Sequence, residues 1–138
     1  AVLEGTIPVK DAVIHEPTLN ADVLLSEKPT SNAADIFSSQ AFADLIKNVR
    51  KSYDYIVIDT PPVLAVPDAR IIGKHVDTTL YTVRWDHTSQ RQVTQGLKEL
   101  AQVNVTVAGL VLAQIDQKGL KRYGYGGQAY AYTGYHDS

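Results

Sequence analysis

Asp59 is the side chain whose place in the sequence first suggests chemistry. It follows the apolar run of residues 55–58, and such a run is typical of a strand buried on both faces of a parallel sheet. Pro61 and Pro62 cannot donate ladder hydrogen bonds, so we expect the strand to end at Asp59, at the sheet edge where open α/β folds bind ligands. A carboxylate there can reach the water shell of a magnesium ion bound to nucleotide phosphates. The alternative is that Asp59 only caps the next turn.

A tyrosine cluster near the end of the chain is the second group of side chains that could take part in chemistry. Five of the eight tyrosines fall within residues 123–135, namely Tyr123, Tyr125, Tyr130, Tyr132 and Tyr135. Many glycines and few aliphatic residues accompany them, so we expect residues 118–138 to form a flexible tail. Such a tail is often inert low-complexity sequence, and phosphorylation is its functional alternative. Phosphate on all five tyrosines would add a charge of about −7 to −10, which outweighs the chain's net charge of −2.

The remaining pattern predicts the elements that would position Asp59. We expect helices at residues 8–14, from 38 or 39 to 50, at 67–72, and from 88 or 89 to 103. The expected caps are Thr6 for the first helix, Ser38 or Ser39 for the second, and Thr88 or Ser89 for the fourth. We expect strands at residues 21–25, 55–59, 78–85 and 105–115, the last one interrupted at Gly109. This alternation predicts an α/β fold with a parallel, doubly wound sheet and right-handed crossovers over residues 1–117.

The composition excludes several classes of function. The chain has 138 residues, of which 44% are hydrophobic and 20% charged, as expected for one compact domain. A net charge of −2 gives no electrostatic basis for binding nucleic acid. The absence of cysteine excludes disulfides, thiolate metal sites and cysteine nucleophiles. The histidines lack the spacing of a zinc site, and the serines lack the glycine-flanked elbow of hydrolases.

The string IVIDTPPVLAVPDA (residues 56–69), together with the tyrosine cluster, resembles the bacterial tyrosine kinases (BY-kinases) of capsule and exopolysaccharide synthesis. Residues 32–37 are similar to that family's Asn-Pro-x-Glu-Leu-Leu segment. The related MinD and ParA ATPases share the Asp-Thr-Pro-Pro-like element but lack the tyrosine tail. The resemblance implies a fold of the P-loop NTPase type. No Gly-x-x-x-x-Gly-Lys-Ser/Thr loop occurs in this sequence, so we expect the phosphate loop upstream of Ala1 and interpret the chain as the C-terminal part of a kinase domain.

The resemblance also implies roles for individual residues, with ATP and Mg²⁺ as cofactors. Asp59 would be catalytic, as the Walker B acid that helps to hold Mg²⁺ through water. Other positions would lie near the nucleotide or its phosphates, namely Thr60, Pro61, Asp68 and Gln114. For Asp68 the alternative is a structural helix cap, and for Gln114 the sequence departs from the family, because Ala113 stands where we expect asparagine. The five tyrosines of the tail would be the phosphoacceptors.

The implied function is ATP-dependent tyrosine autophosphorylation that regulates exopolysaccharide polymerisation and export. The implied partners are further copies in a homo-oligomer, a membrane-spanning activator region or protein, and a tyrosine phosphatase, at the cytoplasmic face of the bacterial inner membrane. We expect the chain by itself to be inactive. Two alternatives stay open: a MinD- or ParA-like ATPase, and a non-catalytic interaction module with a tyrosine-rich tail.

Overall fold

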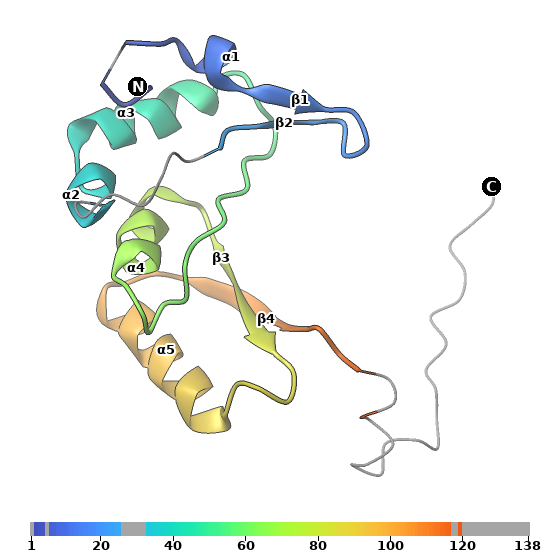
Figure 1. Ribbon diagram of the computed structural model, residues 1–138. Helices are drawn as coiled ribbons and strands as arrows, with labels where there is room; N and C mark the ends of the chain where they lie inside the picture. Colours follow the sequence, from blue (N-terminus) through green and yellow to red (C-terminus); the bar gives the residue numbers. More distant parts are fainter. Residues whose placement is uncertain (1, 5, 26–32, 117–118, 120–138) are drawn as a thin grey trace.

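The computed structural model describes residues 2–4, 6–25, 33–116 and 119 (Figure 1). Its elements in chain order are α1 (Val9–Ala12), β1 (Ile14–Glu16), β2 (Ala21–Val23), α2 (Ala33–Phe37), α3 (Gln40–Val49), α4 (Asp68–Ile72), the 3₁₀ turn η1 (Gly73–His75), β3 (Thr79–Arg84), α5 (Gln90–Gln102) and β4 (Val107–Ala113). The expected tail lies outside the described residues except for Gly119. Its predicted flexibility therefore stays a prediction.

The unit β3-α5-β4 confirms the parallel α/β prediction for these strands. β3 pairs with β4 in parallel, and α5 makes the crossover (Figure 1). Ser89 caps α5, because its hydroxyl accepts a hydrogen bond from the Gln92 backbone N–H at 3.2 Å while the Gln92 side chain accepts one from the Ser89 N–H at 2.9 Å. The ladder shifts register between Thr79 and Leu80, and Leu80 pairs with Gly109. The irregularity therefore lies beside Gly109, where the sequence predicted one.

An antiparallel hairpin of β1 and β2 precedes this unit. The sequence predicted a strand at residues 21–25 within the parallel sheet and placed residues 13 and 14 in a helix. The strand is present, but its antiparallel pairing and the strand that begins at Ile14 both contradict the prediction. Val13 and Ile14 are β-branched and adopt extended backbone easily. Asn20 has a φ of 48° in the turn that follows, a left-handed conformation that asparagine tolerates. The turn brings Ile14–Glu16 beside Ala21–Val23, and this pairing outweighs the helical pattern.

The hydrophobic core forms on the predicted face of α3. Phe42, Ile46 and Ile72 are buried together. Partly buried side chains pack around them, namely Leu3, Phe37, Leu45, Ile58 and Val76. The Phe42 ring meets Phe37 edge-on at a centroid distance of 5.2 Å and His75 at 5.4 Å. This core therefore joins α2, α3, α4 and η1 to the segment that carries Asp59.

A second contact region joins α5 to β3 and α4. Gly96 of α5 lies against the Tyr81 hydroxyl and the Val63 side chain, where a Cβ atom would overlap both. Arg70 of α4 forms an ion pair with Glu99 of α5 at 2.9 Å. Burial, assisted by the charge of Glu99, raises the pKa of Tyr81. The absence of a side chain at Gly96 is thus what lets α5 lie close to β3.

The predicted central strand differs most from the structure. Residues 53–62 form neither a helix nor a strand, and no described strand pairs with them. Tyr55 and Val57 are 91% and 92% exposed, whereas Ile56 is 39% exposed and Ile58 packs on the core. This alternation is the period of extended chain with one covered face. Burial on both faces was therefore wrong for the described chain, because a second layer and a neighbouring strand are what such burial requires.

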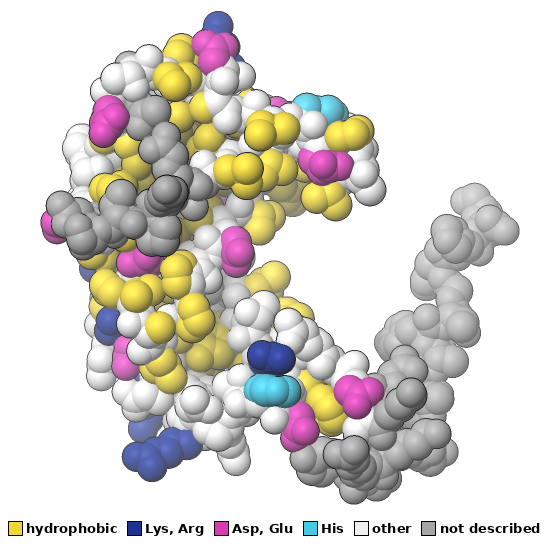
Figure 2. All heavy atoms as spheres, in the orientation of Figure 1, with side chains coloured by type: hydrophobic (Ala, Val, Ile, Leu, Met, Phe, Trp, Pro, Cys, Tyr) yellow, Lys and Arg dark blue, Asp and Glu magenta, His cyan; other side chains and the backbone are white. Residues whose placement is uncertain are grey.

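Hydrophobic side chains consequently reach the surface in several places. Figure 2 shows them on this face of the molecule, among other places over the β1–β2 hairpin, where Ile14 and Leu19 are exposed. The β3–β4 pair also exposes Leu80, Leu110 and Leu112. These surfaces are apolar patches of the kind that mark contacts with further protein.

Candidate functional site

Asp59 is held by its neighbours along the chain. Ile58 packs on the core, and the chain turns after Pro62, whose carbonyl accepts hydrogen bonds from the N–H groups of Ala65 at 2.9 Å and Val66 at 3.4 Å. Asp59 itself is exposed. No described residue donates a hydrogen bond to its carboxylate, so within the described chain it does not cap that turn. The structure presents a solvated acid next to a fixed hydrophobic anchor.

Two further predicted site residues continue from Asp59 along the same segment. Thr60 is half-buried and Pro61 is exposed. Both lie between the Ile58 anchor and the turn at Pro62. Thr60 and Pro61 are next to Asp59 in the sequence and therefore lie close to it, as the motif requires.

Asp68 is the buried member of the predicted set. It is 7% exposed and occupies the first turn of α4, with Pro67 at the cap position and no side-chain cap hydrogen bond. A negative charge in a first turn is favourable because it interacts with the helix dipole. The predicted placement is confirmed. This placement is the one that the structural alternative requires, and the role of Asp68 near the phosphates stays a prediction.

Gln114 belongs to a different part of the chain from the other candidates. It directly follows β4, is exposed, and has a φ of 58°, in the left-handed region that non-glycine residues rarely adopt. No hydrogen bond or strand pairing among the described residues joins it to Asp59. The structure therefore leaves the nucleotide role of Gln114 as a prediction. The five phosphoacceptor candidates of the tail lie outside the described residues and also stay predictions.

A side-chain network that the sequence analysis missed lies at the start of the central segment. The Tyr53 hydroxyl donates a hydrogen bond to Asp22 Oδ2 at 2.7 Å, and His15 Nδ1 lies 2.9 Å from Asp22 Oδ1. These two hydrogen bonds, that of Tyr53 foremost, lower the pKa of the Asp22 carboxyl. The same carboxylate raises the pKa of Tyr53. No sequence signal could have found this contact, because it joins residues 31 positions apart.

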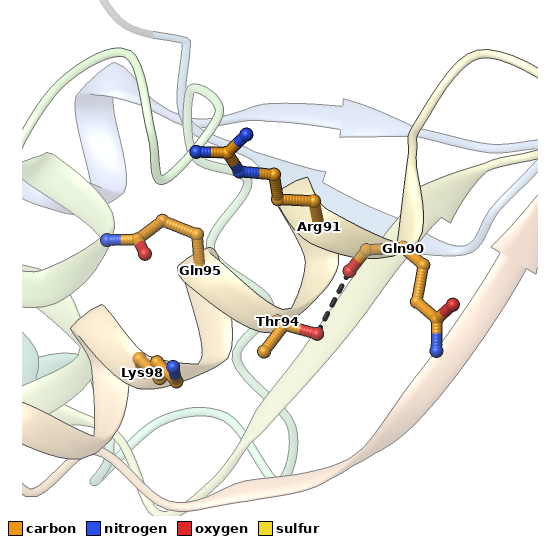
Figure 3. A pocket seen from close by; sticks show the side chains of 5 residues that line it. All are labelled: Gln90, Arg91, Thr94, Gln95 and Lys98. Carbon is orange, nitrogen blue, oxygen red and sulfur yellow. Dashed lines mark hydrogen bonds between the residues drawn. The ribbon is translucent and has the colours of Figure 1, made fainter.

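A shallow hollow of about 400 Å³ lies on α5 and contains none of the predicted site residues. Figure 3 shows the side chains that line it, Gln90, Arg91, Thr94, Gln95 and Lys98, all from this one helix. The Thr94 hydroxyl donates to the Gln90 carbonyl at 3.0 Å. No second element closes the hollow, so it is a polar helix surface rather than a cleft.

The residues present fit a magnesium ion only as part of a larger ligand set. No cluster of three or more acidic, histidine or cysteine side chains suited to a metal occurs in the described part of the chain. Asp59 offers one exposed carboxylate, and Mg²⁺ in phosphate-binding sites takes one or two carboxylates together with water and phosphate oxygens. No helix within residues 2–4, 6–25 and 33–116 has both the length and the apolar character to cross a membrane.

Several known proteins are similar to this chain in sequence and fold. A family model described as an AAA domain matches residues 1–109. The tyrosine-protein kinase wzc of Salmonella typhi is 35% identical over 108 residues, which are 77% of this chain and 15% of that protein. The VpsO kinase domain has a TM-score of 0.77 and 32% identity over 83% of this chain and 56% of that one. The kinase domain of the Escherichia coli tyrosine kinase ETK has a TM-score of 0.78 and 25% identity over 84% of this chain and 46% of that one.

The matched region is limited in extent. The chain spans 15% to 17% of the length of the first three curated relatives. The family model nevertheless covers most of the chain and includes Asp59 and the segment that positions it. The chain therefore belongs to the AAA domain family, and within it corresponds to part of the kinase domain of the bacterial tyrosine kinases (BY-kinases).

Proposed function

We propose that this chain is the C-terminal part of an ATP-dependent protein-tyrosine autokinase, with Asp59 as the catalytic carboxylate that helps to hold Mg²⁺. The observation that carries the proposal is the exposed Asp59 carboxylate, set beside the anchored Ile58 in a chain similar to tyrosine-protein kinases. An exposed acid without a described hydrogen-bond partner is available to water bound to a metal.

Catalysis would depend on positioning and charge. Mg²⁺, bound with ATP, supplies positive charge that stabilises the transferring phosphoryl group. Asp59 would help to hold that ion through its bound water, and the packing of Ile58 on the core fixes the backbone beside the carboxylate. A tyrosine hydroxyl of the tail attacks the γ-phosphorus, the bond to the ADP oxygen breaks, and the hydroxyl proton leaves to solvent. In this scheme Thr60, Pro61 and Asp68, the last in the first turn of α4, would lie near the phosphates, and Gln114 would lie near the base.

The wider role is proposed from the resemblance of residues 56–69 and of the tyrosine cluster. The kinase would act on Tyr123, Tyr125, Tyr130, Tyr132 and Tyr135 of a neighbouring copy in a homo-oligomer. It would work at the cytoplasmic face of the inner membrane with a membrane-spanning activator, and a tyrosine phosphatase would reverse it. Phosphorylation would regulate exopolysaccharide polymerisation and export, because a tail carrying about −7 to −10 added charge is repelled by the acids of the site.

Asp59→Asn in the natural full-length protein tests the proposal. The amide keeps the size of the carboxylate and removes its charge, so we expect the fold to be kept and autophosphorylation to fall roughly a hundredfold or more. Asp54→Asn is the matched control, because Asp54 is exposed on the same segment and should leave the rate unchanged. Equal rates for Asp59→Asn and the unmodified protein would refute the catalytic role.

A mixing experiment tests the acceptors and separates the kinase from the alternatives. Replacing the five tail tyrosines by phenylalanine removes their hydroxyls and keeps the rings. This variant should still phosphorylate an Asp59→Asn copy with an intact tail, because its own site is unchanged. Mass spectrometry that finds no tyrosine phosphate on the tail of the acceptor would favour a cargo-moving ATPase or an interaction module.

A further inference from the structure

The network of Tyr53, Asp22 and His15, called the clasp from here on, joins the β1–β2 hairpin to the segment that carries Asp59. Tyr53 donates to one oxygen of Asp22 at 2.7 Å, and His15 meets the other at 2.9 Å. The side chains of Asp22 and His15 are 31% and 60% exposed. Both carboxylate oxygens of Asp22 thus have a partner, which fixes the orientation of the carboxylate toward Tyr53.

Tyr53 lies where the hydrogen-bonded end of α3 gives way to a stretch without regular secondary structure. Its backbone N–H still donates to the Val49 carbonyl at the end of α3, at 3.1 Å. From there residues 54–57 run without a regular element, and Tyr55 and Val57 are almost fully exposed. Figure 1 shows this stretch passing the β1–β2 hairpin on its way to α4. The next firm contact is Ile58 on the core.

Among the described residues the segment is therefore held at two points, Tyr53 and Ile58, and Asp59 directly follows the second. A chain fixed at one point can pivot there, whereas a chain fixed at two points five residues apart has a defined direction. The clasp supplies the first point through a side chain, in addition to the backbone bond of Tyr53. Loss of that hydrogen bond leaves Ile58 as the side-chain anchor of the segment.

We propose that Tyr53 is a positioning residue, which acts through the clasp to hold the Asp59 segment in the direction needed for its carboxylate to meet the metal-bound water. This inference rests on the proposed function of Asp59. Asp22 is the receiving group, and His15 keeps Asp22 oriented. The tyrosine hydroxyl, rather than the aromatic ring, carries the effect.

The structure offers matched controls for both partners. Tyr53→Phe removes the bonded hydroxyl, and Tyr55→Phe removes one from a side chain that is 91% exposed, two residues away. Asp22→Asn weakens the acceptor, and Asp54→Asn neutralises an exposed acid beside Tyr53. In the natural full-length protein, Tyr53→Phe and Asp22→Asn should each raise the Mg²⁺ concentration for half-maximal autophosphorylation about threefold to tenfold, the scale of one hydrogen bond.

Three features of the kinetics would identify positioning. The maximal rate at saturating Mg²⁺ should stay within about twofold, because only the placement of the carboxylate changes. Tyr55→Phe and Asp54→Asn should leave the Mg²⁺ dependence unaltered. The double variant Tyr53→Phe/Asp22→Asn should be no worse than either single one, because both remove the same interaction. Effects that multiply, or equal shifts for Tyr53→Phe and Tyr55→Phe, would overturn the inference.

Hydrogen exchange of the nucleotide-free protein tests the clasp without any catalytic readout. Tyr53→Phe should speed exchange of the paired amides of the β1–β2 hairpin, Ile14–Glu16 and Ala21–Val23, and of the amide of residue 53, which donates to the Val49 carbonyl, whereas Tyr55→Phe should not. If Asp59→Asn retained full activity, the proposed function would fail while the exchange result still decided whether the clasp holds the segment. Unchanged exchange in Tyr53→Phe would overturn the clasp. Faster exchange with unchanged Mg²⁺ dependence would overturn its positioning role.

Discussion

Gly96→Ala tests how closely α5 lies on β3. A Cβ atom at this position would overlap the Tyr81 hydroxyl and would lie 2.9 Å from Val63 Cγ1 and 3.0 Å from Tyr81 Cζ. Helix propensity alone predicts that alanine stabilises a helix interior by about 1 kcal/mol relative to glycine. Forcing an extra carbon into a packed contact costs about 1 to 3 kcal/mol. We therefore expect a net loss of about 1 kcal/mol in the free energy of unfolding, opposite in sign to the propensity.

Two further variants locate the cause of this loss. Tyr81→Phe in the Gly96→Ala background removes the hydroxyl nearest to the new methyl group, so part of the lost stability should return. The return should be partial, because Tyr81 Cζ and Val63 Cγ1 remain within 3.0 Å of the methyl position. Gly109→Ala is the matched control, since nothing lies within 4 Å of a Cβ atom there. It should cause no loss.

Urea unfolding followed by tryptophan fluorescence measures these differences. Trp85 is the single tryptophan of the sequence and lies half-buried directly after β3, so its emission reports on the unfolding of the β3 region. A Gly96→Ala protein that is more stable than the unmodified chain would refute the close contact between α5 and β3. An equal loss in Gly109→Ala would show that the effect belongs to glycine replacement in general.

Three other outcomes follow from the exposed surfaces, the sequence and the charges. Calorimetry of the 138-residue chain with Mg-ATP should show binding no tighter than about millimolar, because the sequence contains no phosphate loop, and a micromolar dissociation constant would contradict this. Light scattering should show self-association of the same chain through its exposed apolar side chains, and a clean monomer would argue against that. Hydrogen bonds from Tyr53 and His15 lower the pKa of Asp22 below 3.8 in the folded chain. The contribution of ionised Asp22 to stability should therefore be complete above pH 3.8 and be lost as the pH falls through the lower pKa of the folded state. In an NMR titration, Tyr53→Phe should move the pKa of Asp22 back toward 3.8.

The helices were the most predictable part of the fold. Ser39 and Ser89 cap α3 and α5, and each is one of the two neighbouring candidates that the sequence offered. The predicted apolar face of α3 contains the buried Phe42 and Ile46. These features depend on neighbours within about four residues, which a sequence pattern records directly. The parallel pairing of β3 and β4 followed from the intervening helix, because a crossover of that kind joins parallel strands.

The β1–β2 hairpin and the clasp were harder to predict from the sequence. Residues 13 and 14 fit a helical pattern, and the hairpin forms because a turn brings Ile14–Glu16 beside Ala21–Val23. The clasp joins Tyr53 to Asp22 across 31 positions, and neither side chain belongs to a motif. Contacts of this kind arise from the tertiary arrangement, which propensity and spacing do not encode.

The central segment shows what an apolar pattern does record. Tyr55 and Val57 belong to a run typical of a strand covered on both faces, yet they are the most exposed apolar side chains of the described chain. Leu80 and Leu110 on the β3–β4 pair are exposed in the same way. A sequence carries the apolar residues that the complete packed domain requires, and the solved kinase domains that share this fold are longer than this chain. The side of the segment that bears Tyr55 and Val57 is therefore uncovered in the described chain, whereas Ile58 packs on the core.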